Sequence, residues 1–256
     1  MSAVTKIFKG FIPFGIVEAY EKTRGSRIGG LYRDRTDPWA PAGEATKSIA
    51  RIWVENQYYE DAEDPKWVET FWGEDRVFVK RFSTLNCSRI VELACGHGRH
   101  VPHYLSKADE ITLIDINREN IDFCKKRFEN ETKIKYLVGS GNNFNGIETG
   151  SQTAVFSYDA MVHFEMLDVI EYLKETYRVL ENGGKFLFHH SNAAFSPELS
   201  CEGKPHGRNF MSADVFACVA LRLGFTILSQ DVFSWSTGKG YQKNLDCLTL
   251  CVKIEK

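Results

Sequence analysis

Short hydrophobic runs alternate with segments of helical periodicity from residue 89 to the end of the chain. Seven runs bounded by turn residues predict strands. They read RIVELA (89–94), ITLID (111–115), KIKYLV (133–138), TAVFSY (153–158), KFLFHH (185–190), TILSQDVF (226–233) and DCLTLCVKIE (246–255). Because strands that alternate with helices form a parallel sheet covered on both faces, this order predicts a layered α/β domain.

Hydrophobic positions recur at helical spacing after the first, second, fourth and fifth of these runs. The positions are Val101, Tyr104 and Leu105; Ile121, Cys124 and Phe128; Met166 to Leu180; and a segment that Ser212 can cap and Gly224 ends. Only a loop separates the last two runs, so these two strands are expected to pair antiparallel. The predicted fold is α/β, a doubly wound, Rossmann-like, mostly parallel seven-stranded sheet with an antiparallel edge strand, plus an N-terminal helical arm or cap.

The first 85 residues predict a basic arm and a helical cap, ahead of a domain over residues 86–256. Residues 1–35, the N-terminal arm, hold seven basic and three acidic residues, a local charge of +4, interleaved with the apolar stretch IFKGFIPFGIV. Such a segment can pack on its own domain as a lid, or contact an anionic membrane surface or a protein partner. Residues 49–82 read as mostly helical and rich in aromatic residues, which is typical of core or of a cap over a pocket.

Composition narrows the class of protein. A net charge of −2 over 256 residues offers no broad basic surface, which argues against a nucleic-acid partner. The sequence has no apolar run long enough to span a bilayer and no secretory signal pattern. Seven cysteines without a CxxC pair fit reduced thiols. We therefore expect a cytoplasmic protein, with peripheral membrane contact through the arm left open and the oligomeric state not predicted.

The first predicted strand runs into a glycine turn, VELACGHGRH (91–100). In a doubly wound sheet ligands bind beyond the carboxyl ends of the strands, and Gly96 and Gly98 let the backbone approach such a ligand. Asp115 ends the next strand roughly 20 residues further on, where a carboxylate can accept the hydroxyls of a ribose. The motif therefore predicts a nucleoside site.

Two residues distinguish between nucleoside ligands. A dinucleotide site has a third glycine near the pyrophosphate, and Val101 occupies that position here. Glu92 lies inside the strand, where a carboxylate suits a cationic amino group better than a pyrophosphate. S-adenosyl-L-methionine has a ribose, an ammonium and a sulfonium and no phosphate. We therefore expect it as the cofactor, with S-adenosyl-L-homocysteine as the product.

These motifs resemble those of a known family. VELACGHGRH followed by ITLIDIN resembles motif I and the next strand of class I S-adenosylmethionine-dependent methyltransferases. The segments VGSGNNF, AVFSYDAMVHFE and ETYRVLENGGKFLFHH resemble, in order, the adenine-binding loop, the fourth strand with its active-site turn, and the helix, glycine turn and fifth strand of that family. The resemblance covers about residues 88 to 256 and implies methyl transfer, with a small-molecule or sugar O-methyltransferase favoured.

The resemblance also implies how the cofactor is held. Glu92 would bind the methionine amino group, and Asp115 would bind the ribose. Further expected contacts are Ala94, Gly96 and Gly98 through the backbone, Ile116 at the adenine, Ser140, Gly141 and Asn142 in the loop after the third strand, and Tyr158 at the end of the fourth strand. Many members have an aspartate where Ser140 stands, and a hydroxyl or amide oxygen can accept the same bond.

Methyl transfer to a hydroxyl needs an aligned acceptor and a group that removes a proton. His163, just past the fourth strand, is the predicted general base because imidazole titrates near working pH. The alternative is a histidine that packs on the following helix. Asp159 is expected to orient the site or cap that helix, and His189 is a candidate for the acceptor pocket at the end of the fifth strand. Asp159 and His163 alone form a thin ligand set, so no metal is predicted.

The favoured acceptor is a hydroxyl of a small molecule or a glycan. The stretch FIPFGIVEAY (11–20) is similar to segments that precede methyltransferase domains in bacterial polysaccharide pathways. The long loop 191–210, with His206 and Arg208, is typical of a substrate lid. N-methylation of a small amine is the main enzymatic alternative. An NAD-binding oxidoreductase, and a protein that binds S-adenosylmethionine without turnover, are the alternatives from other classes.

Overall fold

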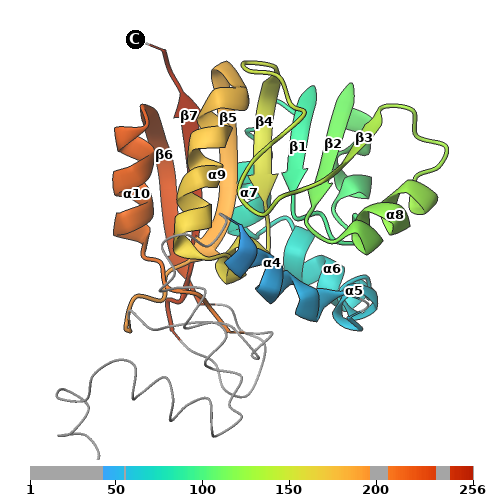
Figure 1. Ribbon diagram of the computed structural model, residues 1–256, viewed down its shortest axis with the longest axis horizontal. Coiled ribbons are helices and arrows are strands. Elements are labelled where there is room, and N and C mark those ends of the chain that lie inside the picture. The colour runs from blue at the N-terminus through green and yellow to red at the C-terminus, as the bar shows by residue number, and fades with distance from the viewer. Residues whose placement is uncertain (1–42, 55, 197–206, 235–242, 256) are drawn as a thin grey trace, which may run out of the picture.

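A seven-stranded sheet forms the centre of the computed structural model, in the order β3-β2-β1-β4-β5-β7-β6 (Figure 1). The structure describes residues 43–54, 56–196, 207–234 and 243–255. The strands are β1 Arg89–Leu93, β2 Glu110–Asp115, β3 Ile134–Val138, β4 Gln152–Ser157, β5 Leu180–Ser191, β6 Phe225–Phe233 and β7 Asp246–Lys253. All seven strands predicted from the hydrophobic runs are confirmed.

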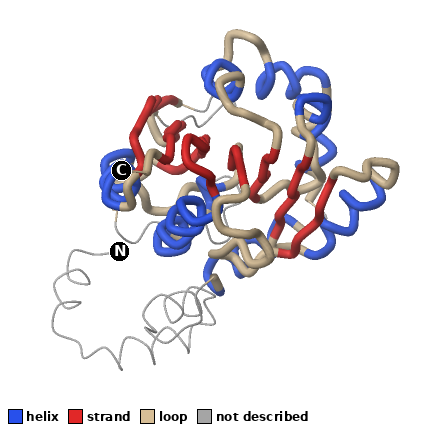
Figure 2. The backbone as a smooth tube through the Cα atoms, turned by 90° about the horizontal axis from the view of Figure 1, so that it is seen from above, coloured by secondary structure: helices blue, strands red, loops and turns tan. Residues whose placement is uncertain are grey.

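Helices cover both faces of this sheet (Figure 2). They are α4 Glu44–Ala50, α5 Tyr58–Asp61, α6 Pro65–Trp72, α7 Val77–Phe82, α8 Arg118–Arg127, α9 Met166–Val179 and α10 Ala213–Arg222. Side-chain caps begin two of them. The Asp64 carboxylate accepts a bond from the Lys66 amide at the start of α6, and the Ser212 hydroxyl accepts one from Val215 at the start of α10, as predicted.

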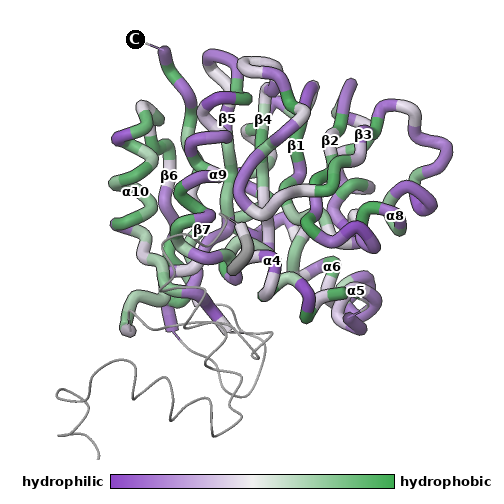
Figure 3. Tube along the Cα trace, in the orientation of Figure 1, coloured by the Kyte–Doolittle hydropathy of each residue, from purple (hydrophilic) through white to green (hydrophobic). Residues whose placement is uncertain are grey.

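Alternate residues of each strand point to opposite faces of the sheet, where they build two hydrophobic clusters. In β1, Ile90 packs in the cluster that includes residues of α6, α7 and α8, whereas Val91 and Leu93 pack in the cluster beneath α9 and α10. Figure 3 shows that α10 is hydrophobic over much of its length, whereas α8 is largely hydrophilic, with a narrow buried stripe that includes Ile121 and Cys124. The sheet therefore has a hydrophobic core on each face.

The segment after β1 is not the α-helix that the hydrophobic spacing predicts. It forms two short 3₁₀ turns, Val101–His103 and Leu105–Lys107, whose backbone bonds run three residues back. Pro102 lacks an amide donor. Tyr104 leaves the helical region with a φ of −130°, and its hydroxyl donates to a buried carboxylate of β1. The helix prediction is wrong here because a proline and a buried polar contact outweigh the periodicity.

β7 runs antiparallel to both of its neighbours, β5 and β6, and the other adjacent strands pair in parallel. The reversed strand therefore lies one position inside β6, which forms the edge. The doubly wound sheet and the antiparallel pairing at this end of it are confirmed. β5 is longer than its predicted run because its pairing with β4 begins at Leu180 and resumes after the glycine turn with an irregular register.

Residues 43–82, here called the cap, contribute helices α4, α5 and α6 beyond the carboxyl ends of the parallel strands (Figure 1). Several rings of the cap, among them Phe71, Phe78 and Phe82, pack in one cluster with the strands. Phe78 stacks on Tyr158, just past β4, with ring centroids 3.7 Å apart, and Phe82 meets Phe156 at 5.1 Å. The N-terminal arm lies outside the described residues, and the division of the chain at residue 85 stays a prediction.

Replacement of Phe78 by alanine is expected to destabilise the cap and the sheet together, because this ring joins both and is only 2% exposed. Loss of a buried phenylalanine ring costs about 3–5 kcal/mol. Urea unfolding, followed by tryptophan fluorescence and by circular dichroism, should show one coincident transition at lower denaturant. The control Leu167→Ala, at a side chain 64% exposed, should shift stability by less than about 0.5 kcal/mol. Separate cap and sheet transitions would contradict a shared core.

Candidate active site

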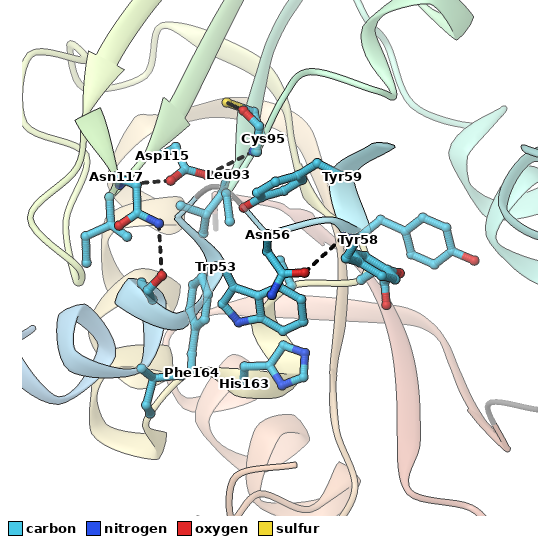
Figure 4. Close-up of a pocket in the computed structure, with 18 of the residues that line it drawn as sticks. Trp53, Asn56, Tyr58, Tyr59, Leu93, Cys95, Asp115, Asn117, His163 and Phe164 are labelled. Atoms are coloured by element: carbon cyan, nitrogen blue, oxygen red, sulfur yellow. Dashed lines mark hydrogen bonds between the residues drawn. The ribbon is translucent and has the colours of Figure 1, made fainter. Parts of the chain in front are cut away.

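A cavity of about 750 Å³ lies between the cap and the carboxyl ends of the strands (Figure 4). Ligand sites typically have volumes of roughly 300–1,000 Å³. Of the residues predicted for the site, its wall contains Ala94, Gly96, Asp115, Ile116, Tyr158, Asp159 and His163. The other predicted residues, which do not line it, are Glu92, Gly98, Ser140, Gly141, Asn142 and His189.

The glycine turn after β1 has left-handed backbone at three positions, with φ values of 59° at Ala94, 52° at Gly96 and 73° at Gly98. A Cβ on Gly96 would come within 2.5 Å of the ring of Tyr59, and one on Gly98 within 2.6 Å of the ring of Phe128. Both glycines are therefore required by rings that pack on the turn, one from the cap and one after α8, as well as by the backbone conformation.

Asp115 is the buried carboxylate that holds this turn. One of its oxygens accepts the Gly96 amide at 2.9 Å. The other accepts the Asn117 amide at 2.9 Å and the Asn120 side chain at 3.1 Å. Burial raises the pKa of Asp115 above its ordinary value, although the backbone bonds from Asn117 and Gly96 oppose that shift. The end of β2 and the glycine turn are thus joined through one side chain.

Tyr59 of α5 extends the Asp115 network into the cap. Its hydroxyl accepts a bond from Asn120 at 3.0 Å, so Asn120 bridges Tyr59 and Asp115. Its ring stacks on His97 with centroids 4.2 Å apart. The cap therefore covers the glycine turn directly, beside the carboxylate predicted to bind the ribose, as Figure 4 shows for Tyr59.

Glu92 lies inside β1 and is 1% exposed. Its Oε2 accepts the Tyr104 hydroxyl at 2.6 Å, and its Oε1 is buried with no hydrogen-bond partner among the described residues. Burial raises the pKa of Glu92 to about 8, although the Tyr104 bond opposes that shift. A buried carboxyl oxygen without a protein partner is unusual, and this one can accept a hydrogen bond from a ligand.

The loop predicted to contact the adenine packs against the beginning of α4. A Cβ on Gly141, where φ is 104°, would lie 2.8 Å from the carbonyl oxygen of Gly43. The Ser140 hydroxyl donates to the Asn142 side chain at 3.1 Å, within the loop itself. Ile116, by contrast, lines the cavity. The cap thus covers this loop, and only the Ile116 side of the predicted adenine site is open to the cavity.

Asp159, with a φ of 59°, lies at the turn after β4 and is the centre of a second polar network. Its Oδ2 accepts Nη2 of Arg99 at 2.8 Å and also the hydroxyl of Tyr58 from α5. Burial would raise the pKa of Asp159, but the charge of Arg99 outweighs it and the pKa lies below its ordinary value. Asp159 therefore stays ionised and ties the cap to the glycine turn.

His189 is completely buried. It does not line the cavity, but it contacts the turn that carries Asp159. The Asp159 amide donates to its Nδ1 at 3.1 Å, so Nδ1 carries no proton and the proton sits on Nε2, 3.0 Å from Asp246. Asp246 also accepts the Nε of Arg208 at 2.8 Å, and Arg208 lines the cavity. His189 thus positions the Asp159 turn, while His206 lies outside the described residues.

His163 lines the cavity beside Trp53 of the cap, with ring centroids 5.3 Å apart (Figure 4). Burial, followed by the nearby charge of Arg208, lowers the pKa of His163 to about 3. The imidazole is therefore neutral at physiological pH, and it is a weaker base than the sequence-based expectation assumed.

Three residues of the site were missed from the sequence: Tyr58, Tyr59 and Arg99. The two tyrosines were noted only as part of an aromatic segment, because their partners are about 40 to 100 residues away in the chain. Arg99 had a local signal, since a cation directly after a glycine turn lies next to whatever the turn binds.

Part of the chain is similar to known methyltransferases. Residues 90–184 match the family model described as "Methyltransferase domain". YqeM of Bacillus subtilis (strain 168), which is named as a methyltransferase, is 30% identical over 101 residues, which cover 39% of this chain. The match spans only 41% of the length of YqeM.

Solved structures of this class share the fold. A methyltransferase of Haloferax volcanii, in complex with the activator Trm112, is 15% identical, with a TM-score of 0.60 over 80% of this chain and 97% of that one. An S-adenosylmethionine-dependent methyltransferase from Mesorhizobium loti is 15% identical, with a TM-score of 0.57 over 69% and 97%. Residues 90–184 of this chain therefore match a methyltransferase domain, and methyltransferases of known structure share its fold.

The residues present fit S-adenosylmethionine. The Oε1 of Glu92, which has no partner among the described residues, suits the ammonium group, and the Asp115 carboxylate in the cavity wall is an acceptor of the kind that a ribose hydroxyl needs. No set of three or more potential metal ligands occurs in the part of the chain that the structure describes. Within the same part, no helix has the length and apolar character needed to cross a membrane.

The Glu92→Gln variant tests whether burial raises the pKa of the Glu92 carboxyl. The folded pKa of about 8 lies above the ordinary 4.5, so the folded protein binds the extra proton and stability falls as pH rises between these values. Glutamine keeps the Tyr104 bond but does not titrate. Urea unfolding at several pH values should therefore show the wild type losing up to about 4 kcal/mol relative to the variant from pH 5 to 8. Parallel pH profiles would contradict the raised pKa.

Proposed function

We propose that this protein is an S-adenosylmethionine-dependent methyltransferase that acts on a small molecule or glycan, with S-adenosylhomocysteine as its product. The observation that carries the proposal is the glycine turn held by Asp115 at the wall of a large cavity, inside a methyltransferase domain. Glu92 and Asp115 would hold the amino group and the ribose, and Ile116 would lie against the adenine. S-adenosylmethionine would supply an electrophilic methyl group on its sulfonium.

The surrounding residues would align the acceptor and exclude water. Tyr58 and Tyr59 close the cavity from the cap side through their bonds to Asp159 and Asn120. Asp159 stays ionised beside Arg99, and His189 orients the turn that carries it. We propose that Asp159 and His189 position the turn after β4, and that His163 contacts the acceptor.

For a hydroxyl acceptor, His163 is the proposed general base, since it lines the cavity and is neutral. Its pKa of about 3 makes it a weak base, which favours a second candidate, N-methylation of a small amine. A neutral amine attacks the methyl group without prior loss of a proton. Dinucleotide oxidoreduction stays disfavoured because Val101 replaces the third glycine and Glu92 is buried in the strand.

We propose that the N-terminal arm contacts a membrane surface or a protein, on the basis of its charge and aromatic residues. The Haloferax volcanii methyltransferase binds a protein activator. Binding of the arm to a protein partner should therefore be tested alongside binding to a membrane surface. No nucleic-acid partner is proposed, and the proposed location is cytoplasmic, with peripheral membrane contact as the alternative.

Isothermal titration calorimetry with S-adenosylhomocysteine and with NADH tests the class of cofactor. The proposal predicts micromolar or tighter binding of S-adenosylhomocysteine and no heat from NADH. Asp115→Ala should weaken S-adenosylhomocysteine binding by about 10-fold or more, because it removes the ribose acceptor and frees the turn that it holds. Binding of NADH alone would overturn the proposed function.

The choice of acceptor chemistry is tested with His163→Asn after a panel of small hydroxyl and amine compounds has been screened with methyl-labelled S-adenosylmethionine. If His163 is the base, the variant should lose about 100-fold in turnover on a hydroxyl acceptor. The wild-type rate should stay flat from about pH 5 to 7, since the acid limb follows a pKa of about 3. An acid limb near the ordinary histidine value, or full activity of the variant, would remove His163 from this role.

A further inference from the structure

Arg99 is a largely buried cation in the wall of the cavity, and its side chain is 13% exposed. Three contacts fix its guanidinium. Nη2 donates to Asp159 at 2.8 Å, Nε lies 3.3 Å from Nε2 of His100, and the central carbon lies 4.1 Å from the centre of the Phe71 ring. The cation is thus held in place before any ligand arrives, which is what a preorganised binding group requires.

The remaining nitrogen of Arg99, Nη1, is buried and has no hydrogen-bond partner among the described residues. Arg99 and His100 also belong to the wall of a second cavity of about 210 Å³, on the side of α6. Arg99 therefore lines both cavities and has one donor without an acceptor among the described residues. Buried donors are normally paired, so this one is a candidate to donate to a ligand acceptor.

Glu92 and Arg99 flank the glycine turn and carry complementary unpaired atoms. Glu92 precedes the turn in β1 with an unpartnered acceptor, and Arg99 follows it with an unpartnered donor. The two side chains are near enough that the charge of Arg99 lowers the pKa of Glu92, against the larger effect of burial. An α-amino acid presents an ammonium and a carboxylate a few ångströms apart, which matches one acceptor and one donor.

We propose that Arg99 binds the α-carboxylate of the methionine part of S-adenosylmethionine, on the other side of the glycine turn from Glu92. This assignment rests on the proposed function. Guanidinium groups bind carboxylates through charge-assisted hydrogen bonds, and Arg99 keeps such a donor although Asp159 already occupies Nη2. A zwitterion also adds one charge of each sign, so Asp159 and Arg99 can remain an ion pair when it binds.

Arg99 then links the cofactor to the acceptor side of the cavity. Its Nη2 holds Asp159 in the turn after β4, and Asp159 accepts the Tyr58 hydroxyl from the cap. A carboxylate on Nη1 would fix the guanidinium further and thereby the Asp159 turn. Arg99 is in this respect a cofactor-binding residue that also positions the acceptor site.

Calorimetry with two ligands tests the proposal. The ligands are S-adenosylhomocysteine and its decarboxylated analogue, in which a hydrogen replaces the carboxylate. The wild type should bind S-adenosylhomocysteine about 10- to 100-fold more tightly than the analogue, as expected for a hydrogen bond to a charged group. Arg99→Met should abolish most of this preference by weakening S-adenosylhomocysteine alone, and Arg99→Lys should keep part of it.

Arg208→Met is the matched control, because Arg208 also lines the cavity and pairs with an aspartate, Asp246. This variant should keep the wild-type preference for the carboxylate. Thermal unfolding of each variant verifies folding, and should Arg99→Met not fold, the intermediate preference of Arg99→Lys carries the test.

The proposal is overturned if Arg99→Met keeps the full preference, if it weakens both ligands equally, or if Arg208→Met abolishes the preference instead. Equal binding of the two ligands by the wild type also overturns it, while leaving the proposed function intact. Absence of any S-adenosylhomocysteine binding by the wild type would remove the proposed function first, and with it this assignment. The two failures are therefore distinguishable in the first titration.

Discussion

The buried carboxylate of Asp115 is the interaction on which the site depends. Its two oxygens accept hydrogen bonds from the Gly96 amide, the Asn117 amide and the Asn120 side chain. Asp115 therefore joins the turn after β1 to the start of α8 and, through Asn120, to Tyr59 of the cap. A carboxylate taken out of water is stable only with several such donors. Because the Asp115 carboxylate needs these donors, the three segments meet at the carboxyl ends of the strands, where a ligand can bind.

The cap completes the site from the opposite side. It shares a hydrophobic cluster with β1 and β4, through rings such as Phe78 against Tyr158, and it is also held by polar contacts. Tyr58 donates to Asp159, and Thr46 of α4 donates to Asp168 at 2.6 Å. Because these bonds join the cap to the turn after β4 and to α9, closure of the cavity depends on packing and on buried hydrogen bonds together.

Much of the fold could be predicted because each strand is a short hydrophobic run with its own turn signals. The 3₁₀ turns after β1 could not, because the bond from Tyr104 to Glu92 is invisible to periodicity. Gly96 and Asp115 could be predicted to lie together because one motif contains both, and their binding of a cofactor stays a prediction. The roles of Ser140, Gly141 and Asn142 stay predictions, since the cap packs over their loop.

The sequence by itself determined the seven strands, the doubly wound class of the sheet and the nucleoside motif, because these depend on local hydrophobic patterns and on residues close in the chain. Only the tertiary structure decided which side chains meet. It buried His163 and thereby lowered its pKa, placed His189 behind the wall, and brought Tyr58 to Asp159 across 101 positions of the chain. Burial and long-range hydrogen bonding are properties of the packed molecule, and no local pattern specifies them.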